Sequence, residues 1–353
     1  MTATNFKTLA GPTLHLRLLA SVGPAFAVSA GYMDPGNWAT DTAAGAFGTR
    51  LLAVIGLANV MAIVMQLLAV RLGGATGEDL ATHIGFPGRG CRYRLRGVLR
   101  HRYRCAVANW YLAISCCDRL RAYLGCGFGS AARVAVGIIG ATVMPHNLFL
   151  HSALVAERRR DTAVPAASVV GRFSRETCIA LSVAGLVNAA ILIVGGALPH
   201  ASNSISDAYS QLGLHFTQSV ALVFGGALVI AGIASSISAT VAGTLIFQGF
   251  GLRTIPIGVR RIFTLGPPLI ATLLGVSPTD IMIWSQVALA FALPIVAVPL
   301  LILTIDRHIM GVFRSSRSLR AVSFAVATIC IARNVIMIIQ FAPPLPASAS
   351  HWF

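Results

Sequence analysis

The chain has few charged residues, and few of those are acidic. Of its 353 residues only 11 are Asp or Glu, against 27 Lys or Arg, and charged residues make up 11% of the total. Soluble domains carry about 25% charged residues, so this chain lacks the side chains to cover a surface facing water. Hydrophobic residues make up 56%, and the mean hydropathy is +0.77. We therefore predict an all-α polytopic membrane protein whose main solvent is the lipid bilayer.

Several functional patterns are missing. The seven Cys are scattered without paired spacing near His, so the sequence predicts neither a zinc site nor a disulfide framework. No nucleophile and base stand in an enzyme-like arrangement. The net charge of +16 has no soluble basic domain that would bind nucleic acid. We expect no enzyme activity, no cofactor, no nucleic-acid partner and no obligate protein partner.

Long apolar segments divide the chain into expected membrane helices. Together with a weakly apolar segment over 105–130, they predict eight or nine helices in a single transmembrane domain over 1–353. Residues 18–84 would hold the first two helices, 134–305 the middle group and 320–342 the last. The apolar segments are 18–43, 49–70, 134–156, 177–198, 217–248, 259–276, 281–305 and 320–342.

The loops alternate in charge, which predicts the topology. Arg residues crowd the loops near 157–175, 253–261 and 307–320, whereas the loops 199–216 and 276–280 contain neither Lys nor Arg. Basic loops stay in the cytoplasm, so the N-terminus is expected to be cytoplasmic. One crossing must then lie between about 72 and 133, and 105–130 is the only candidate.

The interval 85–133 has an aberrant composition. It holds ten Arg and five of the seven Cys but no Lys and no Glu. The run from Gly88 to Ala106 has neither helical nor strand periodicity. One interpretation is a basic cytoplasmic loop. We favour another, a segment translated out of frame or otherwise disrupted, because shifted codons in GC-rich DNA give Arg and Cys without periodicity.

The first apolar segment is interrupted by Asp34, Pro35, Gly36 and Asn37. Pro and Gly remove a backbone hydrogen bond and loosen a helix. Freed carbonyls at membrane depth need partners, and a carboxylate there needs a counter-charge. A plain kink with a paired Asp is the simpler alternative, but one bound cation would satisfy both needs.

A second interruption repeats this design with Met144, Pro145, His146 and Asn147. A thioether is a poor ligand for Ca²⁺ or Mg²⁺ and a better one for softer transition metals. Packing in the core is the alternative role for Met144. The predicted metal ligands are Asp34, Asn37, Met144, the Ala141 carbonyl and, from a later helix, the amide of Gln286. This mixed set of donors suits Mn²⁺ or Fe²⁺.

Two histidines near the second break are candidate proton carriers, because His titrates near neutral pH. They are His146 and His151, with Asp34 as a third proton-linked group; polar packing in a wet cavity is the alternative for each His. Two discontinuous helices in corresponding places also favour an inverted-repeat transporter with its site near the bilayer midplane.

The stretches "MDPGNWATD", "GATVMPHNLFLHSALV", "GIASSISATVAG" and "SQVALAFALPIVAVPLL" resemble the Nramp family of proton-coupled divalent metal transporters, in particular its bacterial MntH manganese-transporter branch. The resemblance covers about 18–84 and 134–342. It implies a LeuT-like fold of inverted repeats in the inner membrane, with 134–305 equivalent to helices six to ten. It also implies proton-driven uptake of Mn²⁺ and Fe²⁺, with the ligands and histidines named above.

The chain departs from the family around its third helix. There the family carries an acidic pair, of which only Asp118 remains beside Arg119 and Arg121. Helices four and five are expected to be absent, so the first repeat is truncated. A non-transporting remnant that binds metal weakly is therefore an alternative function. A sodium-coupled amino-acid transporter of the same fold is disfavoured, because a substrate carboxylate would not sit beside Asp34 and Met144.

Met144 offers a test of the selectivity argument. We expect Met144→Ala to retain Mn²⁺ uptake but to admit more Ca²⁺, because the remaining oxygen donors suit a hard cation. Uptake of both ions by cells carrying the variant measures this effect. Unchanged exclusion of Ca²⁺ would contradict a selective role for the thioether.

Overall fold

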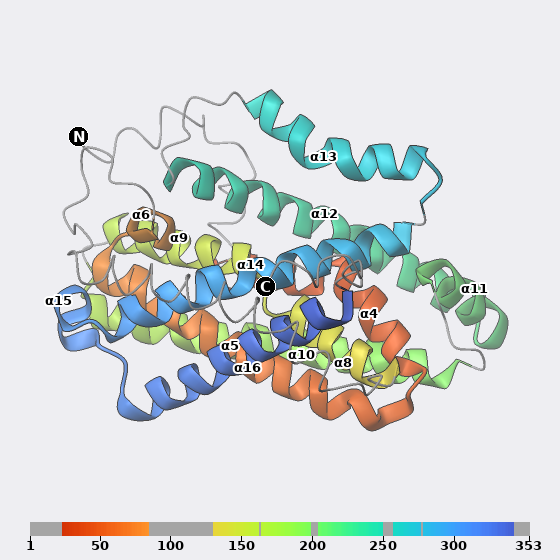
Figure 1. The fold of residues 1–353 in the computed structure, drawn as a ribbon, viewed down its shortest axis with the longest axis horizontal. Coiled ribbons are helices and arrows are strands. Elements are labelled where there is room, and N and C mark those ends of the chain that lie inside the picture. The colour runs from red at the N-terminus through yellow and green to blue at the C-terminus, as the bar shows by residue number, and fades with distance from the viewer. Residues whose placement is uncertain are drawn as a thin grey trace, which may run out of the picture.

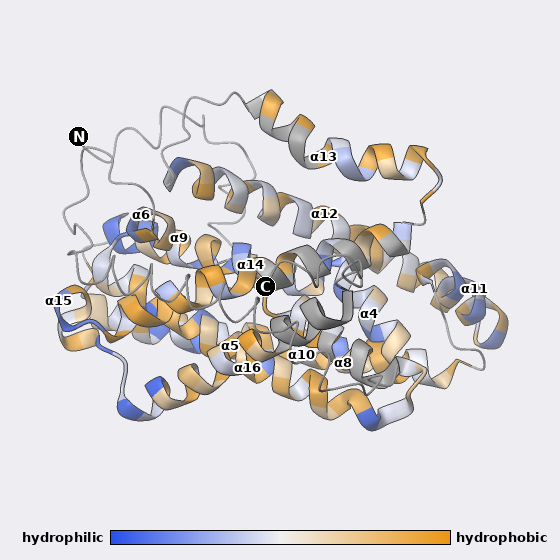
Figure 2. Cartoon of the chain, in the orientation of Figure 1, coloured by the Kyte–Doolittle hydropathy of each residue, from blue (hydrophilic) through white to orange (hydrophobic). Residues whose placement is uncertain are grey.

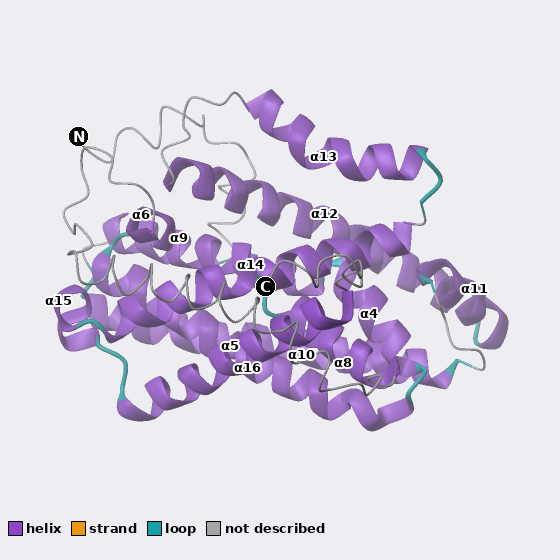
Figure 3. Ribbon diagram, in the orientation of Figure 1, coloured by secondary structure: helices purple, strands orange, loops and turns teal. Residues whose placement is uncertain are grey.

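The computed structural model describes residues 23–84, 130–161, 164–198, 204–249, 257–276 and 278–341. Within these ranges every regular element is a helix and none is a strand (Figure 3), as the composition predicts. The crossing expected over 105–130 and the interval 85–133 lie outside the described residues, apart from their last few positions. Within the described ranges each expected apolar segment is mostly helical, and the interruptions inside segments are at Asp34 and at Val143–Met144.

The two breaks expected from the sequence are present as helix pairs. The first consists of α3 (Pro24–Ser29), η1 (Ala30–Met33) and α4 (Pro35–Gly45), and the second of α8 (Ser130–Thr142) and α9 (Pro145–Asp161). The other elements, in chain order, are η2 (Gly48–Leu51), α5 (Leu52–Thr76), α6 (Leu80–Ile84), α10 (Ala166–Ala197), α11 (Ile205–His215), α12 (Gln218–Gly249), α13 (Ile257–Leu273), α14 (Pro278–Ile305), α15 (Arg307–Met310), η3 (Gly311–Phe313) and α16 (Arg317–Phe341).

Proline chemistry sets the position of both breaks. Asp34 has an extended backbone, with φ −70° and ψ 157°, and Pro35 is the first residue of α4. Proline fits the first turn of a helix because the N–H it lacks would have no helical acceptor there. Pro145 opens α9 in the same way, after α8 ends at Thr142. Each broken span therefore consists of two separate helical segments, the second of which begins at the proline.

Helix α5 forms the centre of the packing, with α9 and α10 along its sides. Met61, Met65 and Leu68 of α5 belong to one buried cluster with Leu148 of α9 and Leu300 of α14. Small residues allow close approach where helices cross: Gly73 of α5 touches the Ser152 carbonyl. Such contacts are common between membrane helices, because burial of apolar surface gives little driving force in lipid.

Four described spans are long and apolar enough to cross a bilayer: Gly48–Thr76, Gly137–Arg160, Ala166–Ala197 and Gln218–Gly249. The pair Ala292–Ile305 and Arg307–Phe313, bent by 67°, is a fifth candidate. Most long helices lie side by side with apolar residues along their length, and polar residues gather near α6, α11 and α15 at the two ends (Figures 1 and 2). The total of eight or nine membrane helices stays a prediction.

The spans differ in their surroundings. The most apolar window of Gly137–Arg160, which contains the second break, is 83% buried, whereas that of α12 is only 11% buried. Exposed Leu222, Val223, Val229 and Ile230 on α12 suit contact with lipid tails. The second broken span is therefore at the centre of the protein and α12 at its periphery.

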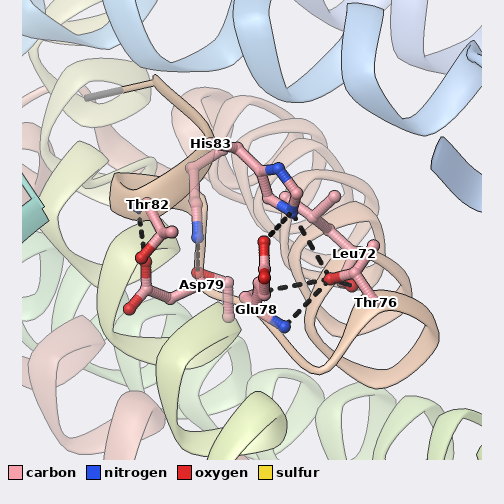
Figure 4. Close-up of polar contacts among 8 residues, drawn as sticks. Leu72, Thr76, Glu78, Asp79, Thr82 and His83 are labelled. Atoms are coloured by element: carbon pink, nitrogen blue, oxygen red, sulfur yellow. Dashed lines mark hydrogen bonds and ion pairs between the residues drawn. The ribbon is translucent and has the colours of Figure 1, made fainter. Parts of the chain in front are cut away.

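A polar corner joins α5 to α6 (Figure 4). Thr76 Oγ1 donates to the Leu72 carbonyl at 2.7 Å and accepts from the Glu78 amide at 3.1 Å. His83 Nε2 lies 3.4 Å from Thr76 Oγ1 and 3.9 Å from Glu78 Oε2. Burial lowers the pKa of His83 to about 4, against the opposing effect of Asp79. His83 is therefore neutral near neutral pH.

His83 should make stability depend on pH. The ordinary pKa of His is 6.5, so on acidification the unfolded chain binds this proton before the folded chain does. The stabilising effect is complete above pH 6.5 and is lost as the pH falls toward 4. We expect the thermal unfolding midpoint of the wild type to fall as the pH is lowered across that window. The midpoint of His83→Gln should fall less steeply. Equal pH slopes for the two proteins would contradict this assignment.

Candidate metal site

Asp34 lies at the centre of the first break and is contacted from two sides. Its Oδ1 accepts a hydrogen bond from the backbone N–H of Asn37 at 2.9 Å. Its Oδ2 accepts one from Gln286 Nε2 of α14 at 3.1 Å, across 252 residues of sequence. The structure thus brings together three of the predicted ligand residues, Asp34, Asn37 and Gln286.

Two amide oxygens at this break lack hydrogen-bond donors. The side-chain N–H₂ of Asn37 donates to the Tyr32 carbonyl at 2.7 Å, which leaves its Oδ1 as the free end. Asn37 Oδ1 and Gln286 Oε1 are both buried, and neither has a hydrogen-bond partner among the described residues. Because buried polar atoms left unpaired are costly, a cation next to them would be stabilised.

The second break contributes a carbonyl and a sulfur. Pro145 has no N–H, so it cannot donate to the carbonyl of Ala141 four residues before it. Met144 is 1% exposed, and Asn147 Nδ2 approaches its Sδ to 3.7 Å. The Asn147 amide also lies against Gly31 of η1, where a Cβ atom would clash with it. The two breaks are therefore in direct contact.

The donor set around the breaks is unusual for a protein metal site. No group of three or more His, Cys, Asp or Glu side chains gathers within the described part of the chain. The available donors are instead one carboxylate, two amide oxygens, a carbonyl freed by proline and a thioether. Oxygen donors bind most divalent cations, and the sulfur favours the softer transition metals. Ligation by these residues stays a prediction.

The histidines differ in their environment. His151 is fully buried on α9, and its Nδ1 lies 2.7 Å from Gln66 Oε1 of α5. Gln66 Nε2 in turn donates to Tyr32 Oη at 2.8 Å. This chain of hydrogen bonds links the second broken helix through α5 to the first. His146, at the start of α9, is only partly buried.

Sequence reasoning missed Tyr32 and Gln66. Both are completely buried, and each forms hydrogen bonds between elements distant in sequence. Gln66 did give a usable indication, since it is a polar side chain within the apolar helix Leu52–Thr76. Polar residues inside membrane spans usually face a partner or a cavity. Nothing comparable distinguishes Tyr32, whose role depends on the packing of α5 beside the break.

Gly36 allows a test of the site geometry. A Cβ atom at this position would collide with Gln286 Nε2 and come within 3.1 Å of Asp34 Oδ2. We expect Gly36→Ala to displace Gln286 and to weaken Mn²⁺ binding to the purified protein by about tenfold or more. Gly56→Ala on α5 is the control, because a Cβ there meets nothing within 4 Å. Equal Mn²⁺ affinity for both variants would exclude a role for the Gln286 contact.

Comparisons with known proteins agree with this arrangement. The profile of the Nramp family, described as natural resistance-associated macrophage protein-like, matches residues 25–86 and 124–340. The divalent metal cation transporter MntH of Aeromonas hydrophila is 32% identical, covering 91% of this chain and 96% of the relative. That of Deinococcus radiodurans is 34% identical, covering 92% and 91%.

A crystal structure of a mutant manganese transporter of Eremococcus coleocola matches with a TM-score of 0.68. It shares 25% sequence identity, over 96% of this chain and 91% of that one. The helical architecture is thus that of a solved metal transporter. With the family profile matching most of its length and relatives above 30% identity, the chain belongs to the Nramp family.

Proposed function

We propose that this protein carries divalent transition metal ions, Mn²⁺ and Fe²⁺, into the cytoplasm in symport with protons. One observation carries the proposal. Asp34, at a helix break, accepts hydrogen bonds from Asn37 and Gln286, and the side-chain amide oxygens of these two residues are buried without a donor in the described part of the chain. The MntH names of the relatives support a divalent metal as substrate.

The mechanism follows from the breaks. Asp34 supplies the charge, Asn37 and Gln286 supply amide oxygens, and the Ala141 carbonyl and Met144 complete the ligand set from the second break. Because each broken span consists of two short helices, one half can tilt while the other holds its ligands. The metal would be exposed first to the outside and then to the cytoplasm. A LeuT-like fold of inverted repeats in the inner membrane would hold the two broken spans in place.

Proton coupling has a structural route in the buried hydrogen-bond chain. His151, Gln66 and Tyr32 are joined side chain to side chain, and the Tyr32 carbonyl holds the amide of Asn37. A proton taken up by His151 would convert both ring nitrogens to donors. Nδ1 already donates to Gln66 Oε1, because Gln66 Nε2 donates to Tyr32 Oη, so the incoming proton goes to the unpaired Nε2. The positive charge then strengthens the bond to Gln66, and Gln66 and Tyr32 would transmit the change to the first break. His146 and Asp34 are the other proposed proton-binding groups.

A second candidate function is a remnant that inserts and binds metal weakly without transporting it. The family match breaks off at residue 86 and resumes at 124, so part of the interval 85–133 has no counterpart in the family profile. Loss of scaffold from the first repeat would leave the ligands in place but hold them loosely. Transport measurements separate this candidate from the first.

Uptake of radiolabelled Mn²⁺ is the direct test of transport. Cells without their own manganese importer would carry this chain, its Asp34→Ala variant or a control, at acidic external pH. We expect uptake by the wild type and none by Asp34→Ala, because the site loses its only carboxylate. Asp207→Ala is the matched control, since it removes an equal charge from an exposed position on α11. Absence of uptake by wild-type protein present in the membrane would favour the remnant.

The proton route predicts a changed pH profile. We expect His151→Ala to flatten the increase of Mn²⁺ uptake with external acidity, because the buried proton acceptor is removed. Gln66→Ala should flatten the profile in the same direction, since it separates His151 from Tyr32. His215→Ala on α11 removes an exposed histidine that takes no part in the chain of hydrogen bonds and should keep the wild-type profile. Unaltered profiles in both test variants would contradict this route.

A further inference from the structure

A second carboxylate is buried near the first break, and the mechanism above does not use it. Asp41 of α4 is 3% exposed, and its Oδ2 has no hydrogen-bond partner among the described residues. Glu78 and Glu176 form ion pairs, whereas Asp41 has none with the described residues. An acidic side chain inside a membrane span needs a counter-charge or a proton. The surroundings of Asp41 therefore decide what it binds.

Asp41 shares a helix face with the predicted ligands. It follows Asn37 by four residues and Asp34 by seven, and these spacings return to the same side of an α-helix. At 1.5 Å per residue, Asp41 lies about 6 Å beyond Asn37 along the axis. Asn37, whose Oδ1 is unpaired, therefore lies between Asp34 and Asp41 along α4.

Helix α10 covers this face and runs in the same direction. Gly23, before α3, lies against Glu176 near the start of α10, while Gly45, at the end of α4, touches Gly195 near its end. The two spans are therefore parallel. Gly45 and Gly195 are in contact, so equal steps back along the two parallel helices reach the same level. Seven residues before them lie Trp38 and Asn188. Asn188 therefore lies level with the stretch from Asn37 to Asp41.

Asn188 also presents a free oxygen to this interface. A spacing of seven residues places it on the same side of α10 as Gly195, which contacts Thr42 and Gly45 of α4. Asn188 is buried, and no group within the described ranges donates to its Oδ1. The helix spacing thus places one carboxylate oxygen and two amide oxygens, each buried without a donor among the described residues, along the interface of α4 and α10.

We propose that Asp41 and Asn188 form a second binding position for a divalent cation on the outer side of the Asp34 site, and that the two positions share the Oδ1 of Asn37. The placement of this position on the outer side rests on the proposed function. With a cytoplasmic N-terminus, α4 runs from Asp34 toward the outside of the cell. The position has oxygen donors and no sulfur, so it accepts Ca²⁺ as readily as Mn²⁺. Cations entering from outside bind at the Asp41 position first. Met144 then selects among them at the Asp34 site.

The test is Mn²⁺ binding to the purified full-length chain in detergent. Free aqueous Mn²⁺ gives a sharp electron paramagnetic resonance signal, so its loss counts the bound ions. In an Asp34→Ala background, which disables the inner site, we expect one weaker Mn²⁺ to remain bound. Adding Asp41→Asn should weaken that binding by about tenfold or more, and Ca²⁺ should displace the ion. Asp207→Asn, in the same background, is the control of equal charge.

The outcomes separate this inference from the proposed function. If the wild type binds Mn²⁺ and Asp34→Ala binds none, the outer position does not exist, while the Asp34 site stands. If Asp41→Asn alters proton release on Mn²⁺ binding without loss of an ion, Asp41 holds a proton and the proposal is overturned. Weak binding that depends on Asp41 in a chain without uptake would support the position and refute transport. Asp34→Asn, which removes the charge but keeps the size of the side chain, provides a second background should Asp34→Ala fail to fold.

Discussion

Two missing backbone N–H groups, those of Pro35 and Pro145, determine the arrangement of the site. In a bilayer each helix must satisfy its own backbone polar groups, and a proline inside a span frees the carbonyl four residues before it. Here both prolines begin new helices, and Gly31 and Ala141 precede them by four positions. The Ala141 carbonyl, which Pro145 cannot pair, the Asp34 carboxylate and the unpaired amide oxygens of Asn37 and Gln286 supply the oxygen donors at the two breaks, and these donors attract a cation.

That concentration of oxygens is held in place by contacts between distant parts of the chain. Gln286 reaches Asp34 from α14, and Asn147 packs against Gly31, so both breaks and the late helix form one unit. The hydrogen bonds from His151 through Gln66 to Tyr32 tie α5 into the same unit. A movement of either broken helix therefore changes the positions of the proposed ligands and the environment of His151 together, and the proposed symport with protons needs such a link.

Much of this arrangement could be predicted from the sequence, because membrane helices follow from local composition. Apolar runs marked the helices, and polar residues with proline in the middle of such runs marked both breaks. Gln286, expected from the sequence as a ligand from a later helix, does contact Asp34. The positions of Tyr32 and Asp41 could not be predicted, because they depend on which helix faces share an interface. Gln66 was recognisable as a polar residue in an apolar helix, but its partners His151 and Tyr32 were not. The number of membrane crossings and ligation by Ala141, Met144 and the others stay predictions.

The central claim is that one divalent ion binds where the two breaks meet. Crystals of the full chain soaked in Mn²⁺ would locate that ion directly by its anomalous scattering at the manganese absorption edge. The account predicts a single strong peak within bonding distance of Asp34 and Met144, with a weaker one at Asp41 when Mn²⁺ is abundant. A peak bound elsewhere, with none between Asp34 and Met144, would contradict it.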